Sequence, residues 1–281
     1  MAPRVTGLIH YPVKGCAGVT LERATVAPTG IEHDRRFLIV SAADGRFLSQ
    51  RGNPAMALIR PAVLDGGARL SLALPGRDEL VVDVDPDGPP RTVTVHSWEG
   101  TGIDQGDSAA SRLSEALGED VRLCYAPESM DRSRTGRFTS TTHFADAYPI
   151  LLASQASLDT LTARLGERGS DGVPMNRFRP NIVVDGWDEP HTEDRVDRLG
   201  MSGVELGFEQ ECTRCTIPLV DQETGRKDGP EPIRTLADYR RGPEGGVIFA
   251  ANYAVLTPGA VSVGDTVTVH SWLAHAESSP S

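Results

Sequence analysis

Frequent glycine and proline residues cut this 281-residue chain into short apolar segments. Turn sequences such as Pro28-Thr29-Gly30 and Asp44-Gly45 separate these segments. Short apolar runs between turns are typical of β-strands, and many of them in one chain indicate a barrel or a curled sheet. We therefore predict a mainly β protein of the α+β class. The predicted strands lie at residues 5–11, 19–26, 37–40, 69–74, 80–84, 92–96, 182–184, 204–208, 247–255 and 267–270.

Two segments have the spacing of amphipathic helices instead. In the first, Asp107 or Ser108 can cap a helix whose apolar residues share one face and which ends at Gly118. In the second, Ser154 can cap a similar helix that ends at Gly166. Both helices are expected to pack on a sheet.

The stretch between these two helices, residues 126–142, is polar and lacks periodicity. It is either a linker or a mobile flap. We therefore predict two structural parts, residues 1–125 and residues 143–272, which this stretch connects. A disordered tail is expected at residues 273–281, because the ends of a chain commonly fray.

The formal net charge is −11, from 28 basic and 39 acidic side chains. Proteins that bind nucleic acids or anionic membranes are normally basic, so we expect neither partner. No apolar run approaches the roughly 18–20 residues that a membrane helix needs, and the start of the chain lacks the features of a secretory signal. The expected compartment is the cytoplasm, where the four cysteines would be thiols.

The sequence Cys212-Thr213-Arg214-Cys215 is the most informative short motif. A structural zinc site would need two further ligands at suitable spacing, which the chain lacks. A thioredoxin-like dithiol would begin a helix, whereas residues 216–220 have the pattern of a short strand. Two interpretations remain: a pair of buried thiols that pack as small apolar groups, or a single thiolate ligand or nucleophile whose pKa Arg214 lowers.

Basic residues stand next to several of the predicted strands. Lys14 follows the first strand and is either a solvated lysine or a phosphate contact presented together with backbone N–H groups. Arg35 and Arg36 precede the third strand, and one of them can provide the planar fork that anions favour. The alternative for that pair is an ion pair with Asp34 or Glu32.

A further polar segment leads into the strand at 182–184. Arg177, Arg179 and Asn181 alternate along it, so they would point to the same side of an extended chain. Two guanidiniums and an amide on one face suit a phosphate or the edge of a pterin, and a solvated charge stripe is the alternative. Asp146 precedes another apolar run and is open to a structural or a functional interpretation.

The motifs that matter most follow one another in this order: Tyr11-Pro12-Val13-Lys14-Gly15, Asp34-Arg35-Arg36-Phe37, Phe47-Leu48-Ser49-Gln50-Arg51, Phe144-Ala145-Asp146, Arg177-Phe178-Arg179-Pro180-Asn181, Cys212-Thr213-Arg214-Cys215 with Asp221-Gln222-Glu223-Thr224-Gly225, and Phe249-Ala250-Ala251-Asn252. The ordered set resembles the MOSC superfamily, in the form where an N-terminal β-rich domain precedes the MOSC β-barrel. The resemblance covers nearly the whole chain. It is similar above all to the family of the mitochondrial amidoxime reducing component and the bacterial YcbX-like proteins.

This resemblance implies a molybdenum–pterin group, the molybdenum cofactor, between the two parts of the chain. It implies that the thiolate of Cys215 is the protein's ligand to the metal and the catalytic residue. Lys14 and Arg36 would bind the pterin phosphate, while Arg179 and Asn181 would contact the cofactor from the second part. The remaining implied cofactor contacts are Gly15, Asp146, Tyr148, Arg214 and Asn252.

The implied activity is the reduction of N-hydroxylated small molecules, such as amidoximes, hydroxylamines and hydroxylated bases, by oxygen-atom transfer. The cysteines lack the spacing of a plant-type iron–sulfur cluster, so we expect a separate electron-donor protein of the ferredoxin or flavoprotein reductase type. One alternative is a molybdenum cofactor carrier or sulfur-transfer protein that uses the same cysteine. The other is a module that binds a phosphate ligand without catalysis.

Overall fold

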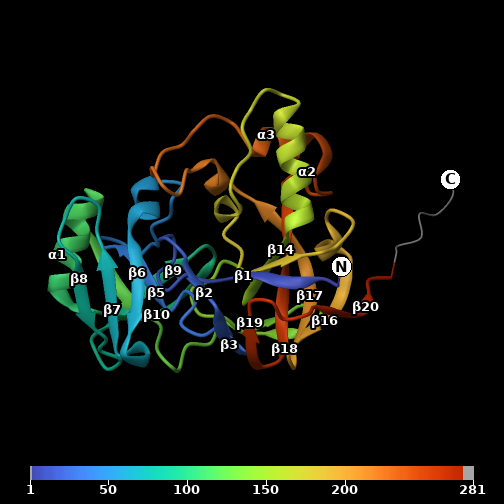
Figure 1. The fold of residues 1–281 in the computed structure, drawn as a ribbon. Helices are drawn as coiled ribbons and strands as arrows, with labels where there is room; N and C mark the ends of the chain where they lie inside the picture. The colour runs from blue at the N-terminus through green and yellow to red at the C-terminus, as the bar shows by residue number, and fades with distance from the viewer. Residues whose placement is uncertain (1, 275–281) are drawn as a thin grey trace.

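The computed structural model describes residues 2–274, and strands dominate that part of the chain. The chain forms two lobes that lie side by side (Figure 1). The first lobe contains helix α1 (Gly106–Leu117) and two small sheets, and the second contains helix α2 (Gln155–Gly166), helix α3 (Ile233–Tyr239) and a large sheet. The mainly β, α+β class predicted from the turn pattern is therefore confirmed.

The second lobe is built around an eight-stranded sheet. A three-stranded sheet contributes Val26 and Val261 to the same apolar core. In hydrogen-bonded order, the large sheet comprises β2 (Val19–Leu21), β1 (Arg4–His10), β15 (Ile182–Asp185), β14 (Ile150–Ser154), β18 (Val247–Thr257), β17 (Val204–Arg214), β16 (Val196–Met201) and β20 (Thr268–Trp272). The smaller sheet comprises β19 (Gly259–Ser262), β3 (Arg23–Ala27) and β4 (Gly30–Ile31).

The first lobe has its own core, in which Leu113 of α1 packs with Ile39 and Leu70. Its strands form one sheet of β5 (Phe37–Ser41), β11 (Val121–Tyr125), β10 (Trp98–Asp104) and β9 (Pro90–Val95), and a second sheet of β6 (Arg60–Leu64), β7 (Arg69–Ala73) and β8 (Leu80–Asp83). A short hairpin, β12 (Arg134–Thr135) and β13 (Thr139–Ser140), occupies the predicted linker or flap.

The first strands of the chain belong to the second lobe. Strand β1 lies between β2 and β15, and Val5 and Leu8 pair with Val184 and Ile182. Both side chains enter the core of the large sheet, because an irregularity in the pairing between Val5 and Gly7 shifts the alternation of β1 by one residue. The strand pairing therefore places the start of the predicted first part, residues 1–125, in the sheet of the second lobe.

The two predicted helices are present, with one difference at a helix start. The Oγ of Ser154 accepts a hydrogen bond from the Ser157 amide at 3.2 Å, as predicted for an N-cap, and α2 ends at Gly166. Gly118 follows α1 in the left-handed conformation, also as predicted. The predicted caps of α1 were wrong: the helix begins at Gly106, and its first amide donates to Asp104 Oδ1.

Other differences concern segments around the candidate motifs. The strand predicted at 216–220 was wrong, because Pro218 lacks an N–H and stands inside a 3-10 turn, Ile217–Leu219. The short helix α3 was missed altogether. Of the predicted tail, Leu273 donates its amide to the Arg195 carbonyl, and residues 275–281 lie outside the described range. No helix within residues 2–274 has the length and apolar character to cross a membrane.

Candidate functional site

A pocket of about 220 Å³ takes its wall from both halves of the sequence. The loop after β1 and residues 47–51 contribute from the first half, and the end of β17 contributes from the second. Of the ten site residues predicted from the sequence, all except Arg36 line this pocket. The ones that do are Lys14, Gly15, Asp146, Tyr148, Arg179, Asn181, Arg214, Cys215 and Asn252.

Cys215 follows the last residue of β17 and is exposed. Within residues 2–274 its Sγ has no hydrogen-bond partner. The neighbouring Arg214 contacts the other cysteine of the motif, because its Nη1 lies 3.0 Å from Cys212 Sγ while its Nη2 donates to the Phe178 carbonyl. Cys212 is therefore held in the wall, and Cys215 is the free thiol of the pocket.

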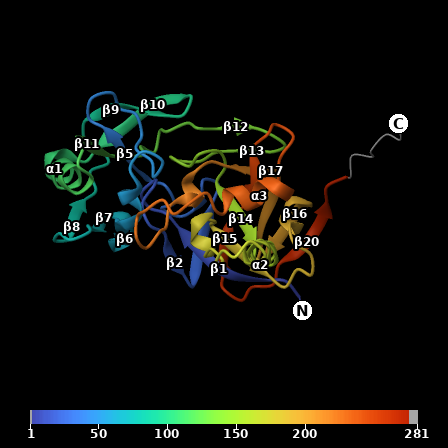
Figure 2. The same ribbon diagram turned by 90° about the horizontal axis from the view of Figure 1, so that it is seen from above.

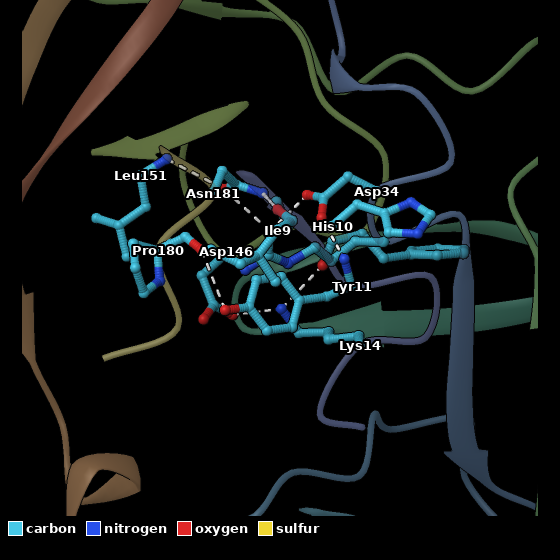
Figure 3. A network of polar contacts seen from close by, with 12 residues as sticks. Ile9, His10, Tyr11, Lys14, Asp34, Asp146, Leu151, Pro180 and Asn181 are labelled. Carbon is cyan, nitrogen blue, oxygen red and sulfur yellow. Dashed lines mark hydrogen bonds and ion pairs between the residues drawn. The ribbon is translucent and has the colours of Figure 1, made fainter. Parts of the chain in front are cut away.

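Lys14 is a buried cation in the opposite wall. Its Nζ donates to the Phe144 carbonyl at 2.8 Å and to Asp146 Oδ1 at 2.5 Å (Figure 3). Burial lowers the pKa of this lysine, and the charge of Asp146 acts against that shift. The turn that carries Lys14 continues with Gly15 at φ +84°, where a Cβ would lie 2.8 Å from Met56 Cε. A glycine is therefore required at this approach of the backbone.

Arg36, which we predicted to bind a phosphate, does not line the pocket. Its guanidinium points away and contacts His143 Nε2, the Tyr125 hydroxyl and Glu128. Arg35 lines the pocket instead. The left-handed backbone of Arg35, at φ +47°, gives the two neighbouring side chains different directions.

Arg177 and Arg179 also differ from the prediction. A 3-10 turn, Met175–Arg177, and a left-handed Arg179 at φ +57° replace the expected extended segment. Arg177 therefore turns away from the pocket and pairs with Asp221 at 2.9 Å. Arg179 faces the pocket, is 8% exposed, and has one hydrogen-bond contact in the described chain, to Gln222 Oε1 at 3.4 Å. Burial lowers the pKa of this guanidinium.

Asn181 connects the two ends of the sequence at the pocket. Its Nδ2 donates to the Ile9 carbonyl, and its Oδ1 accepts from the Leu151 amide, both at 3.1 Å (Figure 3). The same Oδ1 accepts from Arg35 Nη1 at 3.1 Å. Every polar atom of this amide is thus engaged, so Asn181 fixes the wall and orients Arg35.

Sequence reasoning missed two further residues of the site. The ring of Tyr11 contacts two guanidiniums, with Arg35 at 4.3 Å and Arg179 at 4.2 Å from its ring centre. Gln50 is fully buried and donates to the Gly15 carbonyl at 2.8 Å. Both stand inside motifs that we quoted, so their position in those motifs was the available signal.

The wall of the pocket is strongly cationic for an acidic protein. Among the lining residues, the basic side chains are Lys14, Arg35, Arg51, Arg179 and Arg214, and Asp146 is the acidic one. The buried Nε of Arg214 has no partner within residues 2–274, which leaves a donor unsatisfied. Buried, underused donors of this kind suit a bound anion. A phosphate-bearing cofactor therefore fits these residues.

A metal beside Cys215 would need ligands that the described chain does not gather. Within residues 2–274, no group of three or more His, Cys, Asp or Glu side chains is placed to hold a metal ion. One exposed thiol can still complete a soft metal site whose other ligands come from a bound cofactor. The donor set thus fits a metal that arrives with its own organic sulfur ligands.

Two family models match this chain. Residues 2–120 match the MOSC N-terminal beta barrel domain, and residues 139–268 match the MOSC domain. The chain is 32% identical to mitochondrial amidoxime-reducing component 1 of Mus musculus, over 94% of this chain and 81% of that protein. It is 32% identical to mitochondrial amidoxime reducing component 2 of Bos taurus, over 94% and 82%.

A second kind of relative is the molybdenum cofactor sulfurase of Danio rerio, at 28% identity over 85% of this chain and 30% of that protein. The amidoxime-reducing components match over most of their own length, whereas the sulfurase does not. Both domain matches and the high coverage of the amidoxime-reducing components support assignment to the same family. The chain belongs to the family of MOSC proteins that comprises the mitochondrial amidoxime-reducing components.

Proposed function

We propose that this protein is a molybdenum-cofactor-dependent oxidoreductase that reduces N-hydroxylated small molecules, such as amidoximes, by oxygen-atom transfer. One observation supports it most: the exposed thiol of Cys215 shares a pocket with the buried cations Lys14 and Arg179. The names of the amidoxime-reducing relatives supply the reaction class. A soft metal ligand and an anion site in one cavity are the two features that such a cofactor requires.

Each part of the pocket has a role in this proposal. The cofactor, when bound, would supply the redox metal and its own sulfur ligands. Cys215 would provide the protein's thiolate ligand to that metal. Lys14, Arg35 and Arg179 would bind the phosphate, and their burial strengthens each contact because little water competes. Asn181 would orient Arg35 toward the same phosphate.

The reaction also needs electrons and protons. We propose a separate electron-donor protein, of the ferredoxin or flavoprotein reductase type, because the cysteines of the chain lack iron–sulfur spacing. The exposed position of Cys215 leaves that edge of the pocket open to a small-molecule substrate.

The test measures molybdenum content and benzamidoxime reduction with an artificial electron donor. Protein from a cofactor-competent host is expected to contain near-stoichiometric molybdenum and to reduce benzamidoxime. Cys215→Ser is expected to lose turnover, because a hydroxyl does not replace a thiolate on a soft metal. Cys212→Ser is the matched control and is expected to retain both metal and turnover, since Cys212 is held by Arg214. Turnover retained in Cys215→Ser would contradict the proposal.

The second candidate function is a molybdenum cofactor carrier or sulfur-transfer protein. The similarity to the molybdenum cofactor sulfurase favours it. The same thiol of Cys215 would then carry sulfur instead of completing a catalytic metal site. Wild-type protein that contains molybdenum and pterin but does not reduce benzamidoxime or a hydroxylamine would support this candidate over the reductase.

A further inference from the structure

A histidine from the first lobe reaches the rim of the pocket. His96 stands in the turn between β9 and β10, in the left-handed region at φ +55°, and it does not belong to any motif noted in the sequence. Its Nε2 lies 2.8 Å from Asp146 Oδ1, the same oxygen that accepts from Lys14 at 2.5 Å. Its ring packs edge-on against Phe47, 4.9 Å between ring centres. His96, Asp146 and Lys14 thus form one polar cluster.

Asp146 opposes the binding of an anion in this pocket. Burial raises the pKa of its carboxyl, but the charge of Lys14 and the contact with His96 outweigh burial and hold the pKa well below the ordinary value. The group is therefore a carboxylate at neutral pH. An anion that takes Lys14 as its partner must displace this carboxylate or lie against it, and the second outcome brings two like charges together.

His96 can remove this conflict. We propose that His96 is a further residue of the anion site: it receives the Asp146 carboxylate when a phosphate monoester occupies Lys14, and it takes up a proton as it does so. The inference rests on the proposed function only for the identity of the natural ligand, a phosphate-bearing cofactor. In the free protein, Asp146 neutralises Lys14; in the bound protein, the anion does so, and the protonated imidazole neutralises Asp146.

Besides Asp146, one carboxylate of the described residues lies close to these groups: Asp34 pairs with Arg35 at 2.5 Å, and the remaining charged neighbours are cations. Arg35 and Arg132 lie near Lys14, and Arg132 donates to the Ala145 carbonyl at 2.7 Å, beside Asp146. The pKa of Arg132 is lowered by burial to about 10, so its charge does not change near neutrality. A proton that the cluster takes up can bind either the imidazole of His96 or the amine of Lys14, and the variants below distinguish the two. Lys14 itself is the rival, because burial lowers its pKa.

The experiment measures the affinity of the cofactor-free full chain for sulfate as a function of pH. Sulfate keeps two negative charges across this range, so any pH dependence belongs to the protein. Protein from a host without pterin synthesis is melted in graded sulfate, and the rise of the melting temperature gives the dissociation constant. We expect the wild-type affinity to fall from roughly pH 6 to pH 8, by at most about tenfold per pH unit, which is the limit for one linked proton.

Three variants separate the possible outcomes. His96→Gln keeps a donor for Asp146 but cannot take up a proton, so its sulfate affinity is expected to stay flat over this range. Asp146→Asn is expected to bind sulfate more tightly than the wild type at the high end of the range. His270→Gln is the matched control, because His270 is also half-exposed and near a carboxylate, Glu205 at 3.7 Å, and it is expected to follow the wild type.

Three results would overturn the inference: no sulfate binding by the wild type, no pH dependence, or the same pH dependence in His96→Gln. The last result would assign the proton to Lys14. None of these results depends on molybdenum. A chain that binds sulfate with the expected pH dependence but contains no molybdenum in a cofactor-competent host would contradict the proposed function alone.

Discussion

At the scale of single residues, Tyr11 organises the cationic side of the pocket. Its ring contacts the guanidiniums of both Arg35 and Arg179, at 4.3 and 4.2 Å from the ring centre. Burial raises the pKa of Tyr11 to about 12, so the phenol stays neutral. Desolvated contacts between a guanidinium and an aromatic ring contribute about 2 kcal/mol. These contacts let two like charges stay close before any anion arrives.

The arginine pair at 35 and 36 gives a residue-scale prediction. Arg35→Ala should weaken sulfate binding by roughly tenfold or more, because a charge-assisted contact to a buried anion contributes about 1.5–3 kcal/mol. Arg36→Ala should leave sulfate affinity unchanged, since its guanidinium is engaged outside the pocket. The sulfate-dependent melting temperature measures both. Equal losses in the two variants would show that the pocket assignment of Arg35 is wrong.

The sequence identified Arg35 and Arg36 as candidate contacts to an anion, but it did not show which of the two side chains faces the pocket. The alternation rule needs a regular strand, and Arg35 stands before β5 at φ +47°, outside the strand. The same limit applies to Arg179, whose left-handed backbone separates it from Arg177. Which side chain faces a pocket at such positions depends on tertiary contacts, here the ring of Tyr11 and the amide of Asn181.

At the scale of elements, the hairpin β12–β13 is docked on the second lobe (Figure 2). The buried carboxylate of Glu209, on β17, accepts from the Arg137 and Phe138 amides at 2.8 and 3.0 Å. At Gly136 between the strands, a Cβ would lie 2.2 Å from Glu209 Oε2. The polar stretch that we described as a linker or flap is therefore attached to the strand that leads to Cys215.

Removing this carboxylate should release the hairpin. Glu209→Ala should speed hydrogen exchange of the Arg137 and Phe138 amides, because both lose their acceptor. Glu205→Ala, on the same strand, is the control: its carboxylate makes only partly exposed contacts at 3.7 Å and should not affect those amides. Unchanged exchange in Glu209→Ala would mean that other contacts hold the hairpin.

Elements with local signals were predictable, and elements without them were not. Ser154 and Gly118 mark helix ends through their own chemistry, so α2 and the end of α1 followed from the sequence. Helix α3 has Pro232 at its start and no side-chain cap, and it is too short for a clear apolar period. It is stabilised by packing instead, with Leu236 in the core beside Phe249.

At the scale of the whole molecule, the two lobes are tied together by the course of the chain. Strand β3 pairs with β19, and β1 pairs with β15, so the first strands complete sheets made by the last ones. The pocket lies next to these paired strands, because the turn that carries Lys14 follows directly from β1. The wall of the site therefore depends on both lobes being folded.

We predict that the lobes unfold in one transition. Trp98 reports on the first lobe and Trp187 on the second, and variants that keep one of these tryptophans can be followed by fluorescence in urea. The two midpoints should coincide, because contacts between the lobes, such as the paired amides of Gln50 and Gln222 at 3.0 and 2.9 Å, are lost when either lobe unfolds. Separate midpoints would show that the first lobe folds independently.

The pairing of β3 with β19 also sets an order of events during synthesis. Val26 leaves the ribosome early, but its partner Gly259 is made near the end of the chain. At roughly 5–20 residues per second, the early strands wait on the order of ten seconds or more without their neighbours. The prosthetic group that we propose would therefore have to reach a nearly finished polypeptide, because the pocket residues Cys215 and Asn252 are also made late.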